Sequence, residues 1–338
     1  MSETRRLVDT ILVPHTAFQV GQRRMTQCMD YARAGAQEPV CMALIGESRT
    51  GKSRGIEAFM RDHPTVRLPE GIRMSVLYIS VPSRPTVKAL AELGLFHLGA
   101  ADWERGTENA KTTRLVSLMR ACGVMVLVLD EFHHFYDKSS HKVQHHVADW
   151  LKNLLADTKV ALVVSGLPSL RSVVDQNEQL AGRFLSPVPM PRFNWLNDDH
   201  REEWQAILGA FTEGLGTQFD LPSLDGDELA LRMFCATGGL MGYLTMTLRQ
   251  AVWNAVDANR RVINLKDLEV AHGEAVWSKE NVVGLPQPFD RSWTVEATPD
   301  LIARTQLVGA AVVHPERRSP GRRARTAVPA ASSILTSR

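Results

Sequence analysis

The sequence lacks several features that would assign it to a class of protein at once. It has four cysteines, scattered along the chain without a C-x-x-C pair. This pattern is typical of buried, reduced thiols and predicts a cytoplasmic protein. Residues 1–9 are polar and charged, unlike a signal peptide. The strongest apolar run, residues 124–129, is far too short to cross a bilayer, so we expect no contact with a membrane.

Strong charge of either sign is also absent. The formal net charge of +2 excludes a protein that binds nucleic acid through overall basicity, so any contact with DNA must come from local patches. An apolar content of 44% and a charged content of 22% are ordinary for a globular protein. A chain of 338 residues has room for two or three domains, or for one large domain with tails.

The sequence does contain a phosphate-binding signature. Residues 46–53 fit the pattern G-x-x-x-x-G-K-[ST], the P-loop. An apolar run of strand length, residues 40–45, precedes the pattern, and residues 54–61 have the apolar spacing of a helix. Strand, glycine loop and helix are the context that the motif requires. The residues expected to bind nucleotide are Gly46, Glu47, Ser48, Arg49, Thr50, Gly51, Lys52, Ser53 and Arg54.

Each part of this loop has a physical task. Glycines let backbone N–H groups close around phosphate oxygens, and the positive end of the following helix dipole points at the same anion. Lys52 is expected to reach the β- and γ-phosphates of ATP, and the Ser53 hydroxyl is expected to coordinate Mg²⁺.

A second stretch, residues 123–131, complements the loop. Its continuous apolar run predicts a strand that is buried on both faces, and the stretch ends in Asp130 and Glu131. Ligands of open α/β sheets bind at the carboxyl ends of the strands. The pair therefore fits a Walker B motif, in which Asp130 holds Mg²⁺ and Glu131 orients the attacking water.

Histidines crowd the segment that follows this motif. They are His133, His134, His141, His145 and His146. A metal site is one interpretation, but zinc needs three or four converging ligands and no cysteine accompanies these side chains. We therefore expect histidines on a helix face or near phosphate.

The remaining apolar patterns predict the architecture. Residues 1–39 are expected to be mostly helical. Further strands are expected at residues 74–81, 160–166 and 188–193, and helices at residues 83–98, 111–122 and 143–155. From residue 197 only helices are expected, at residues 201–212, 227–236, 240–258 and 265–277. The prediction is an α/β fold with a parallel five-stranded sheet flanked by helices, followed by a small all-helical lid.

These patterns divide the chain into three parts. They are a core at residues 1–195, a lid at residues 196–280 and a mostly disordered basic tail at residues 281–338. Within residues 316–325 five arginines stand against one acid, a local balance of 5 − 1 = +4. The tail is either a solubilising segment or a tether for DNA or a partner protein.

Together these stretches resemble the TniB/TnsC family, the AAA+ regulators of bacterial transposition. The points of likeness are GESRTGKS, VLVLDEFHHF, VVSGLPSL, QLAGRF and TGGLMGYL, spread over residues 10–280. The resemblance implies an ATPase that uses ATP and Mg²⁺ and assembles as a ring or helical filament on double-stranded DNA. It also implies two protein partners, a transposase of the TniA/TnsB type and a target selector of the TniQ type.

The resemblance also carries roles over to individual residues. Ser165 ends the strand with which AAA+ proteins sense the γ-phosphate, and Arg183 stands where they place a finger that acts in trans on a neighbour's nucleotide. A plain Ser-Gly turn and a surface arginine are the alternatives. The candidates for contact with DNA phosphates are Lys88, Lys111 and Arg114, and solvated surface charges are the alternative for each.

Two further points stay open. His15, Phe18 and Val20 lie where such ATPases pack the adenine base, unless they belong to an ordinary helix on the core. Residues 239–244 contain no arginine where many relatives carry a second sensing one, and the first in the lid helix is Arg249. This departure weakens the case for fast hydrolysis. The alternative functions are a helicase-loader or initiator-like ATPase, and a nucleotide-dependent scaffold that does not hydrolyse ATP.

Overall fold

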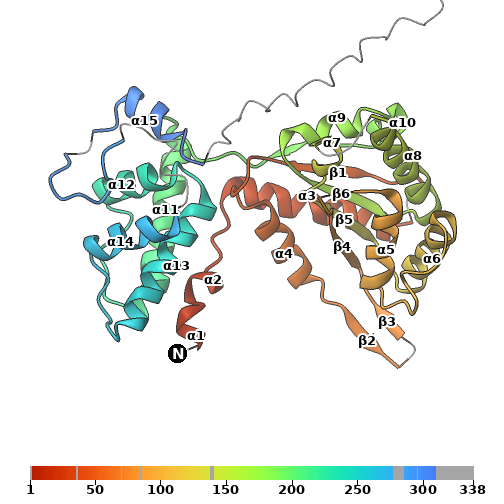
Figure 1. The fold of residues 1–338 in the computed structure, drawn as a ribbon, viewed down its shortest axis with the longest axis horizontal. Coiled ribbons are helices and arrows are strands. Elements are labelled where there is room, and N and C mark those ends of the chain that lie inside the picture. Colours follow the sequence, from red (N-terminus) through yellow and green to blue (C-terminus); the bar gives the residue numbers. More distant parts are fainter. Residues whose placement is uncertain are drawn as a thin grey trace, which may run out of the picture.

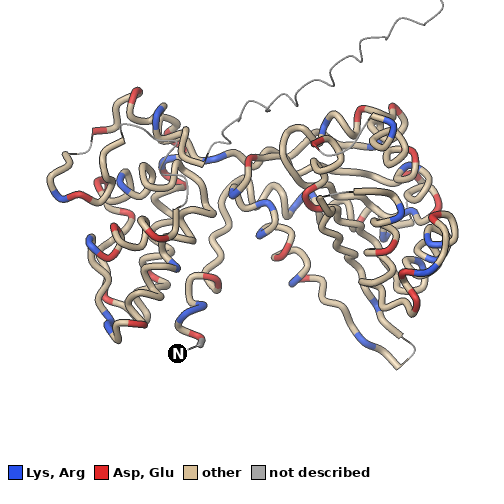
Figure 2. The backbone as a smooth tube through the Cα atoms, in the orientation of Figure 1, with Lys and Arg blue, Asp and Glu red and all other residues tan. Residues whose placement is uncertain are grey.

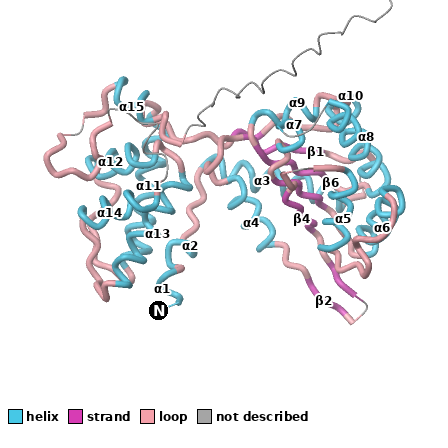
Figure 3. The backbone as a smooth tube through the Cα atoms, viewed as in Figure 1, coloured by secondary structure: helices cyan, strands magenta, loops and turns pink. Residues whose placement is uncertain are grey.

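The computed structural model describes residues 2–35, 37–69, 71–83, 85–137, 141–276, 285–294 and 296–309. Figure 1 shows two lobes, one built around a sheet and the other made of helices. Figure 3 shows that the strands are confined to the first lobe. Basic and acidic residues are interspersed over both lobes in Figure 2, as the small net charge leads one to expect. Within the described residues, none of the helices combines the length and the apolar character needed to cross a membrane.

The central sheet has five strands, all paired in parallel, in the order β4-β5-β6-β1-β7. Their bounds are β1 Cys41–Ile45, β4 Val76–Ser80, β5 Val126–Asp130, β6 Ala161–Gly166 and β7 Val188–Pro189. β6 lies between β1, which leads into the P-loop, and β5, which ends at Asp130. The predicted parallel five-stranded sheet is therefore confirmed.

Helices cover both faces of the sheet. Leu162 and Val164 of β6 pack in a core with α5, α6 and α8, whereas Ala161 and Val163 pack in a second core with α3 and α4. These helices are α3 Thr16–Arg33, α4 Lys52–Asp62, α5 Val87–His97, α6 Glu108–Ala121 and α8 His141–Thr158. Because successive side chains of a strand point to opposite faces, a strand covered on both sides needs an unbroken apolar run.

Short elements complete this lobe. They are α7 His134–Asp137, η1 Pro168–Leu170, α9 Arg171–Val174, α10 Glu178–Ala181 and an antiparallel hairpin of β2 Val66–Leu68 and β3 Gly71–Arg73. The hairpin projects away from the sheet in Figure 1 and was not predicted. Its strands are three residues long, too short for a periodic pattern, and Val66 and Leu68 are exposed.

The second lobe is the predicted helical lid. Its helices are α11 Asp198–Gly216, α12 Asp227–Thr237, α13 Met241–Asp257 and α14 Leu265–Ala275. They enclose a separate apolar core that includes Trp204, Phe211 and Phe234, all at most 1% exposed. The Asn197 side chain caps α11, and Asn264 forms a capping box at the start of α14.

The start of the chain differs from the expected core assignment. Its first helices, α1 Ser2–Arg5 and α2 Leu7–Thr10, pack on the lid rather than on the sheet. Val8 is buried in the lid core, and the indole Nε1 of Trp253 donates to the backbone oxygen of Arg5 at 2.9 Å. An apolar segment this short has no pattern from which the sequence could predict the lobe on which it packs.

The expected disordered tail also needs a correction at its beginning. Within residues 285–309, Phe289, Leu301 and Ile302 are buried in the lid core. Helix α15, Pro299–Thr305, is capped by the Thr298 hydroxyl. Phe289 stands far from the adjacent pair Leu301 and Ile302, so these apolar side chains form no periodic pattern, but all three pack in the lid core, where α15 contacts α12. The arginine-rich residues 316–325 lie outside the described residues.

This correction can be tested by stability. Ile302 is 0% exposed, so Ile302→Ala should lower the free energy of unfolding by about 2–4 kcal/mol through lost burial and a cavity. The matched control Leu307→Ala removes a side chain that is 52% exposed and should change the value by less than about 0.5 kcal/mol. Equal effects in urea unfolding would place residues 285–309 outside the folded lid.

Candidate functional site

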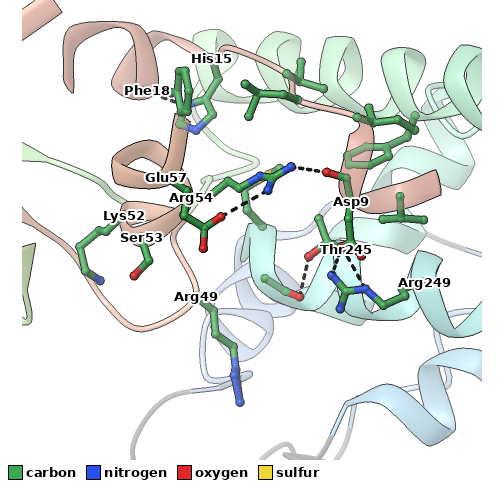
Figure 4. Close-up of a pocket in the computed structure, with 18 of the residues that line it drawn as sticks. Asp9, His15, Phe18, Arg49, Lys52, Ser53, Arg54, Glu57, Thr245 and Arg249 are labelled. Atoms are coloured by element: carbon green, nitrogen blue, oxygen red, sulfur yellow. Dashed lines mark hydrogen bonds and ion pairs between the residues drawn. The ribbon is translucent and has the colours of Figure 1, made fainter. Parts of the chain in front are cut away.

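A cavity of about 570 Å³ lies between the lobes, a volume typical of ligand sites. Its walls come from the P-loop and the start of α4, from the segment before α3, and from α13 of the lid. Figure 4 shows Lys52 and Ser53 on one side of this space and Arg249 on the other, with His15 and Phe18 at a third edge.

Glycine is required at two points of the loop. A Cβ on Gly46 would lie 2.1 Å from the backbone oxygen of Met190, too close for any side chain. Gly51 has φ +97°, a conformation that L side chains rarely adopt. The Thr50 hydroxyl donates to the Glu47 oxygen at 2.9 Å and braces the loop between them.

Lys52 is the first residue of α4 and is only 7% exposed. Its Nζ donates to the backbone oxygens of Gly46 at 2.9 Å and Glu47 at 2.6 Å. Burial lowers the pKa of Lys52, while the carboxylates of Glu131 and Asp130 act in the opposite direction. The ammonium group therefore lies inside the loop, in the field of both Walker B acids.

Asp130 links three elements of the fold. Its carboxylate is 2% exposed and accepts from the Ser53 hydroxyl at 2.8 Å, the Tyr78 hydroxyl at 3.2 Å and the Glu131 backbone N–H at 2.9 Å. Burial, followed by the neighbouring Asp130 charge, raises the pKa of Tyr78 to about 12. Tyr78 was missed from the sequence because it lies inside an apolar strand and belongs to no motif.

Glu131 has a different environment from its neighbour. Its side chain is 42% exposed and lines the cavity. Its backbone has φ +56°, in the left-handed region, which costs about 1–2 kcal/mol for a residue with a side chain. This sharp turn buries the carboxylate of Asp130 while it presents that of Glu131 to the cavity.

The residues expected to contact adenine line two different cavities. His15 and Phe18 line the cavity, whereas Val20 lines a neighbouring one of about 540 Å³. His15 also has a structural task, because its ring nitrogen accepts from the Phe18 N–H and caps α3. Burial lowers the pKa of His15, so its ring is neutral and apolar enough to lie against a base.

The lid brings an arginine to the cavity after all. Arg249 lies about two turns along α13 and lines the pocket. Its Nε is 3.2 Å from the carboxylate of Asp9, and Arg54 of α4 donates to the Asp9 backbone oxygen. Figure 4 shows Asp9 between these two guanidinium groups. The sequence located Arg249 but could not tell which side of the helix faces the site.

Arg49 and Glu47, at positions of the P-loop that the pattern leaves free, connect the loop to the lid. The Gly242 N–H donates to the Arg49 oxygen at 2.8 Å, and the Arg49 guanidinium lies 4.6 Å from the ring centroid of Tyr243. A Cβ on Gly242 would lie 2.6 Å from that of Arg49, so the approach requires glycine.

Glu47 makes the second connection. Its carboxylate pairs with Arg192, a side chain that is 11% exposed. Arg192 also donates to the backbone oxygens of Gly238 at 3.3 Å and Gln306 at 2.7 Å. One guanidinium thus joins the P-loop, the lid and the C-terminal segment. No sequence signal marks Arg192, because it belongs to no motif or periodic pattern.

The residues expected to sense and complete the site do not line this cavity. Ser165 is fully buried beside Leu44 of β1, and its hydroxyl has no hydrogen-bond partner among the described residues. Arg183 donates to the Lys152 oxygen at 3.1 Å, and its own oxygen accepts from Cys41 at the opposite end of β1 from the P-loop. Its proposed action in trans stays a prediction.

Among the expected DNA contacts, the prediction for Lys111 is wrong. Its side chain is 0% exposed, pairs with Glu92 at 2.6 Å and donates to loop carbonyls at Trp103 and Glu104. A buried ammonium held in this way cannot reach a phosphate. Arg114 donates to the oxygens of Ala101 and Asp102, at 2.6 and 3.2 Å. Lys88 is exposed, with no partner in the described part of the chain.

The histidines separate into two groups. His145 and His146 are exposed on α8 and pair with Asp149 at 3.1 Å and Glu108 at 2.8 Å. These two therefore lie on a helix face, as expected. His133 and His134 instead converge on Glu131, with one ligand atom of each residue within 4.8 Å of the others.

The sheet order, the P-loop and the helical lid define an AAA+ fold. A family model described as "Bacterial TniB protein" matches residues 6–195, more than half of the chain. The chain therefore belongs to the TniB family.

Solved structures with a similar fold have low sequence identity. Cdc6p of Pyrobaculum aerophilum is 15% identical, with a TM-score of 0.59 over 82% of this chain and 72% of that one. The ORC2 protein of Aeropyrum pernix, in ADPNP-ADP complexes, is 14% identical, with a TM-score of 0.57 over 81% and 72%. The ORC1 protein of Aeropyrum pernix, in complex with DNA, is 16% identical, with a TM-score of 0.55 over 80% and 69%. At these identities the likeness shows the fold. No curated protein sequence matches this chain.

The Tyr78–Asp130 contact gives a prediction about alkaline stability. Folded Tyr78 keeps its proton up to about pH 12, whereas an unfolded tyrosine loses it near pH ~10. Because the native state then holds more protons, stability should fall as pH rises through this window.

The variant Tyr78→Phe should lose about 0.5–1.5 kcal/mol at neutral pH but show a smaller alkaline decline. Urea unfolding at several pH values measures both effects. Tyr31→Phe is the control, since Tyr31 is 49% exposed. An alkaline slope in Tyr78→Phe that matches the control would contradict the raised pKa of Tyr78.

Proposed function

We propose that this TniB family chain is an ATP-dependent, DNA-binding regulator of transposition. It oligomerises on duplex DNA and links target selection to a transposase. The observation that carries the proposal is the direct contact, at 2.8 Å, between the Ser53 hydroxyl of the P-loop and the Asp130 carboxylate. It joins the two halves of a nucleotide site at a cavity that Lys52 and Glu131 also line.

The cavity suits a nucleoside triphosphate. The backbone N–H groups at the start of α4 and the Lys52 ammonium provide donors and positive charge for the phosphates. His15 and Phe18 offer ring surface for a base at another edge. Arg249 adds a lid cation, which Asp9 neutralises in this structure.

The donor set at Asp130 fits a magnesium ion. A carboxylate and a hydroxyl are hard oxygen ligands, and the partners that the structure gives the Asp130 carboxylate are two hydroxyls and a backbone N–H. Ser53 and Asp130 would hold Mg²⁺, which when bound supplies charge neutralisation to the phosphates. Tyr78 would keep the carboxylate in place by its bond at 3.2 Å.

Glu131 is the residue placed to act on water. Its carboxylate is at the cavity, separated from the buried Asp130 by the left-handed turn. It would orient a water molecule toward the γ-phosphorus and accept a proton as the P–O bond to ADP breaks. The products are ADP and inorganic phosphate. We propose that hydrolysis ends the assembly, and that ATP binding sustains it.

The position of Arg183 supports assembly as the route to a complete site. Because it lies beside Cys41, away from the P-loop of its own chain, its proposed action is on the nucleotide of another subunit. Lys88 remains available for DNA phosphates, since it is exposed on α5. Contacts to DNA phosphates do not depend on the base sequence, which suits a protein that spreads along duplex DNA. The transposase and the TniQ-type selector are the proposed partners.

Other functions are less well supported. The structural neighbours Cdc6p and ORC2 share the fold, but the TniB family match favours transposition over a helicase-loader role. A scaffold without hydrolysis was motivated by the missing lid arginine, and Arg249 at the cavity weakens that case. The direct test of the proposal is Mg²⁺-dependent ATP binding with and without duplex DNA. No binding in either condition overturns it.

Glu131→Gln tests the hydrolytic role. The variant should bind ATP with unchanged affinity, because Lys52 and the loop are intact, but release phosphate at least about 100-fold more slowly. Its filaments on duplex DNA should last longer in electron microscopy with ATP. Lys52→Ala is the control that loses binding itself. Wild-type phosphate release by Glu131→Gln would remove Glu131 from the mechanism.

Arg183 can be tested by mixing variants. Arg183→Ala keeps a nucleotide site but donates no finger. Glu131→Gln keeps its finger and binds ATP, so it still assembles, but it does not hydrolyse ATP, and each variant alone should be nearly inactive. A random 1:1 mixture should recover on the order of a quarter of the wild-type rate, since about that share of interfaces pairs one intact site with one intact finger. Arg171→Ala, on the nearby α9, is the control. A mixture without recovery argues that Arg183 only supports the fold through Lys152.

A further inference from the structure

Beside the proposed magnesium ligands lies a second group of metal-binding side chains. It consists of Glu131, His133 and His134, whose ligand atoms all lie within 4.8 Å of one another. The Oε2 of Glu131 and the Nδ1 of His133 are 3.2 Å apart. Ligands on one ion with bonds of about 2.0–2.2 Å are separated by about 3.0–3.5 Å, so this pair already has the required spacing.

The Nδ1 of His133 is a buried nitrogen without a satisfied hydrogen bond among the described residues. The His133 side chain is 9% exposed. In the tautomer with its proton on Nε2, the imidazole has a lone pair on Nδ1 that lies 3.2 Å from the Glu131 carboxylate. In that tautomer the two acceptors repel each other unless a cation lies between them.

The other ring nitrogens are oriented in the way that metal-binding histidines require. The Nε2 of His133 lies 3.7 Å from the carboxylate of Asp137, and the Nδ1 of His134 lies 2.9 Å from the Val81 oxygen. The hydrogen bond to Val81 fixes the tautomer of His134, whereas 3.7 Å is too long for a hydrogen bond between His133 and Asp137. The Nε2 of His134 is therefore available as the third ligand of the group.

We propose that Glu131, His133 and His134 form a binding site for a divalent transition-metal ion such as Zn²⁺. Two imidazoles and one carboxylate suit borderline metals, whereas Mg²⁺ takes oxygen ligands, so this site and the Ser53–Asp130 pair select different ions. A bound ion keeps Glu131 from orienting water. Metal binding at this site should therefore slow ATP hydrolysis while ATP binding is retained. Only this effect on hydrolysis rests on the proposed function.

The site is tested on the full chain with Co²⁺ as a spectroscopic probe, since bound Co²⁺ absorbs visible light according to its ligands. We expect saturable 1:1 absorption that Zn²⁺ displaces and Mg²⁺ does not. Glu131→Gln and His134→Ala, at partly exposed positions, should each weaken Co²⁺ binding by about tenfold or more. Asp137→Asn should weaken binding in the same direction by removing the negative charge that faces the His133 ring.

His145→Ala is the matched control, because this histidine also pairs with a carboxylate but lies on α8, 61% exposed. It should leave the Co²⁺ spectrum and affinity unchanged. Circular dichroism verifies that each variant is folded. Equal loss in His145→Ala and His134→Ala, or wild-type affinity in Glu131→Gln, shows an adventitious ion only and overturns the site.

A separate measurement tests the consequence for catalysis. Zn²⁺ at saturation should slow phosphate release while the affinity for ATP stays the same, and His134→Ala should be less sensitive to Zn²⁺. If Co²⁺ binds as expected but Zn²⁺ leaves hydrolysis unchanged, the regulatory part is wrong and the site stands. If the protein binds no ATP, the proposed function fails, but the Co²⁺ result still decides the site.

Discussion

The buried carboxylate of Asp130 is the constraint on which the site depends. A charge that is 2% exposed is costly unless hydrogen bonds satisfy it. Here the partners come from three elements: Ser53 on α4, Tyr78 on β4 and the backbone of Glu131 after β5. The carboxylate therefore fixes the helix after the P-loop against the sheet. The same requirement turns the chain sharply at Glu131 and separates the two acids.

The lid is fixed to the P-loop through positions that the motif leaves free. Arg49 contacts α13 at Gly242 and Tyr243, and Glu47 holds Arg192, which binds lid and C-terminal carbonyls. A movement of the loop must therefore disturb contacts of the lid. The residues between the fixed positions of the P-loop pattern thus couple the loop of this chain to the second lobe.

Basic side chains have very different tasks according to their surroundings. Lys111 is buried and donates hydrogen bonds to carbonyls of the loop before α6, so its charge interacts only with groups inside the fold. Arg192 joins three segments, and Arg249 is paired with the carboxylate of Asp9 at the cavity. Lys88 is the expected DNA contact that stays exposed. A list of lysines and arginines on helices cannot separate these cases, because the difference lies in what the neighbouring elements present.

Local patterns in the sequence determined the strands, the P-loop, the Walker B pair and the helical lid. Each depends on neighbouring residues: an unbroken apolar run for a strand buried on both faces, or glycines at fixed spacing for a loop around phosphate. Only the tertiary structure decided the partners of Tyr78, Arg192 and Asp9, the packing of residues 285–309 on the lid, and the convergence of His133 on Glu131. These contacts join segments far apart in the chain or depend on one backbone turn. No periodic pattern encodes them, because a side chain's partner across the fold is set by how whole elements pack.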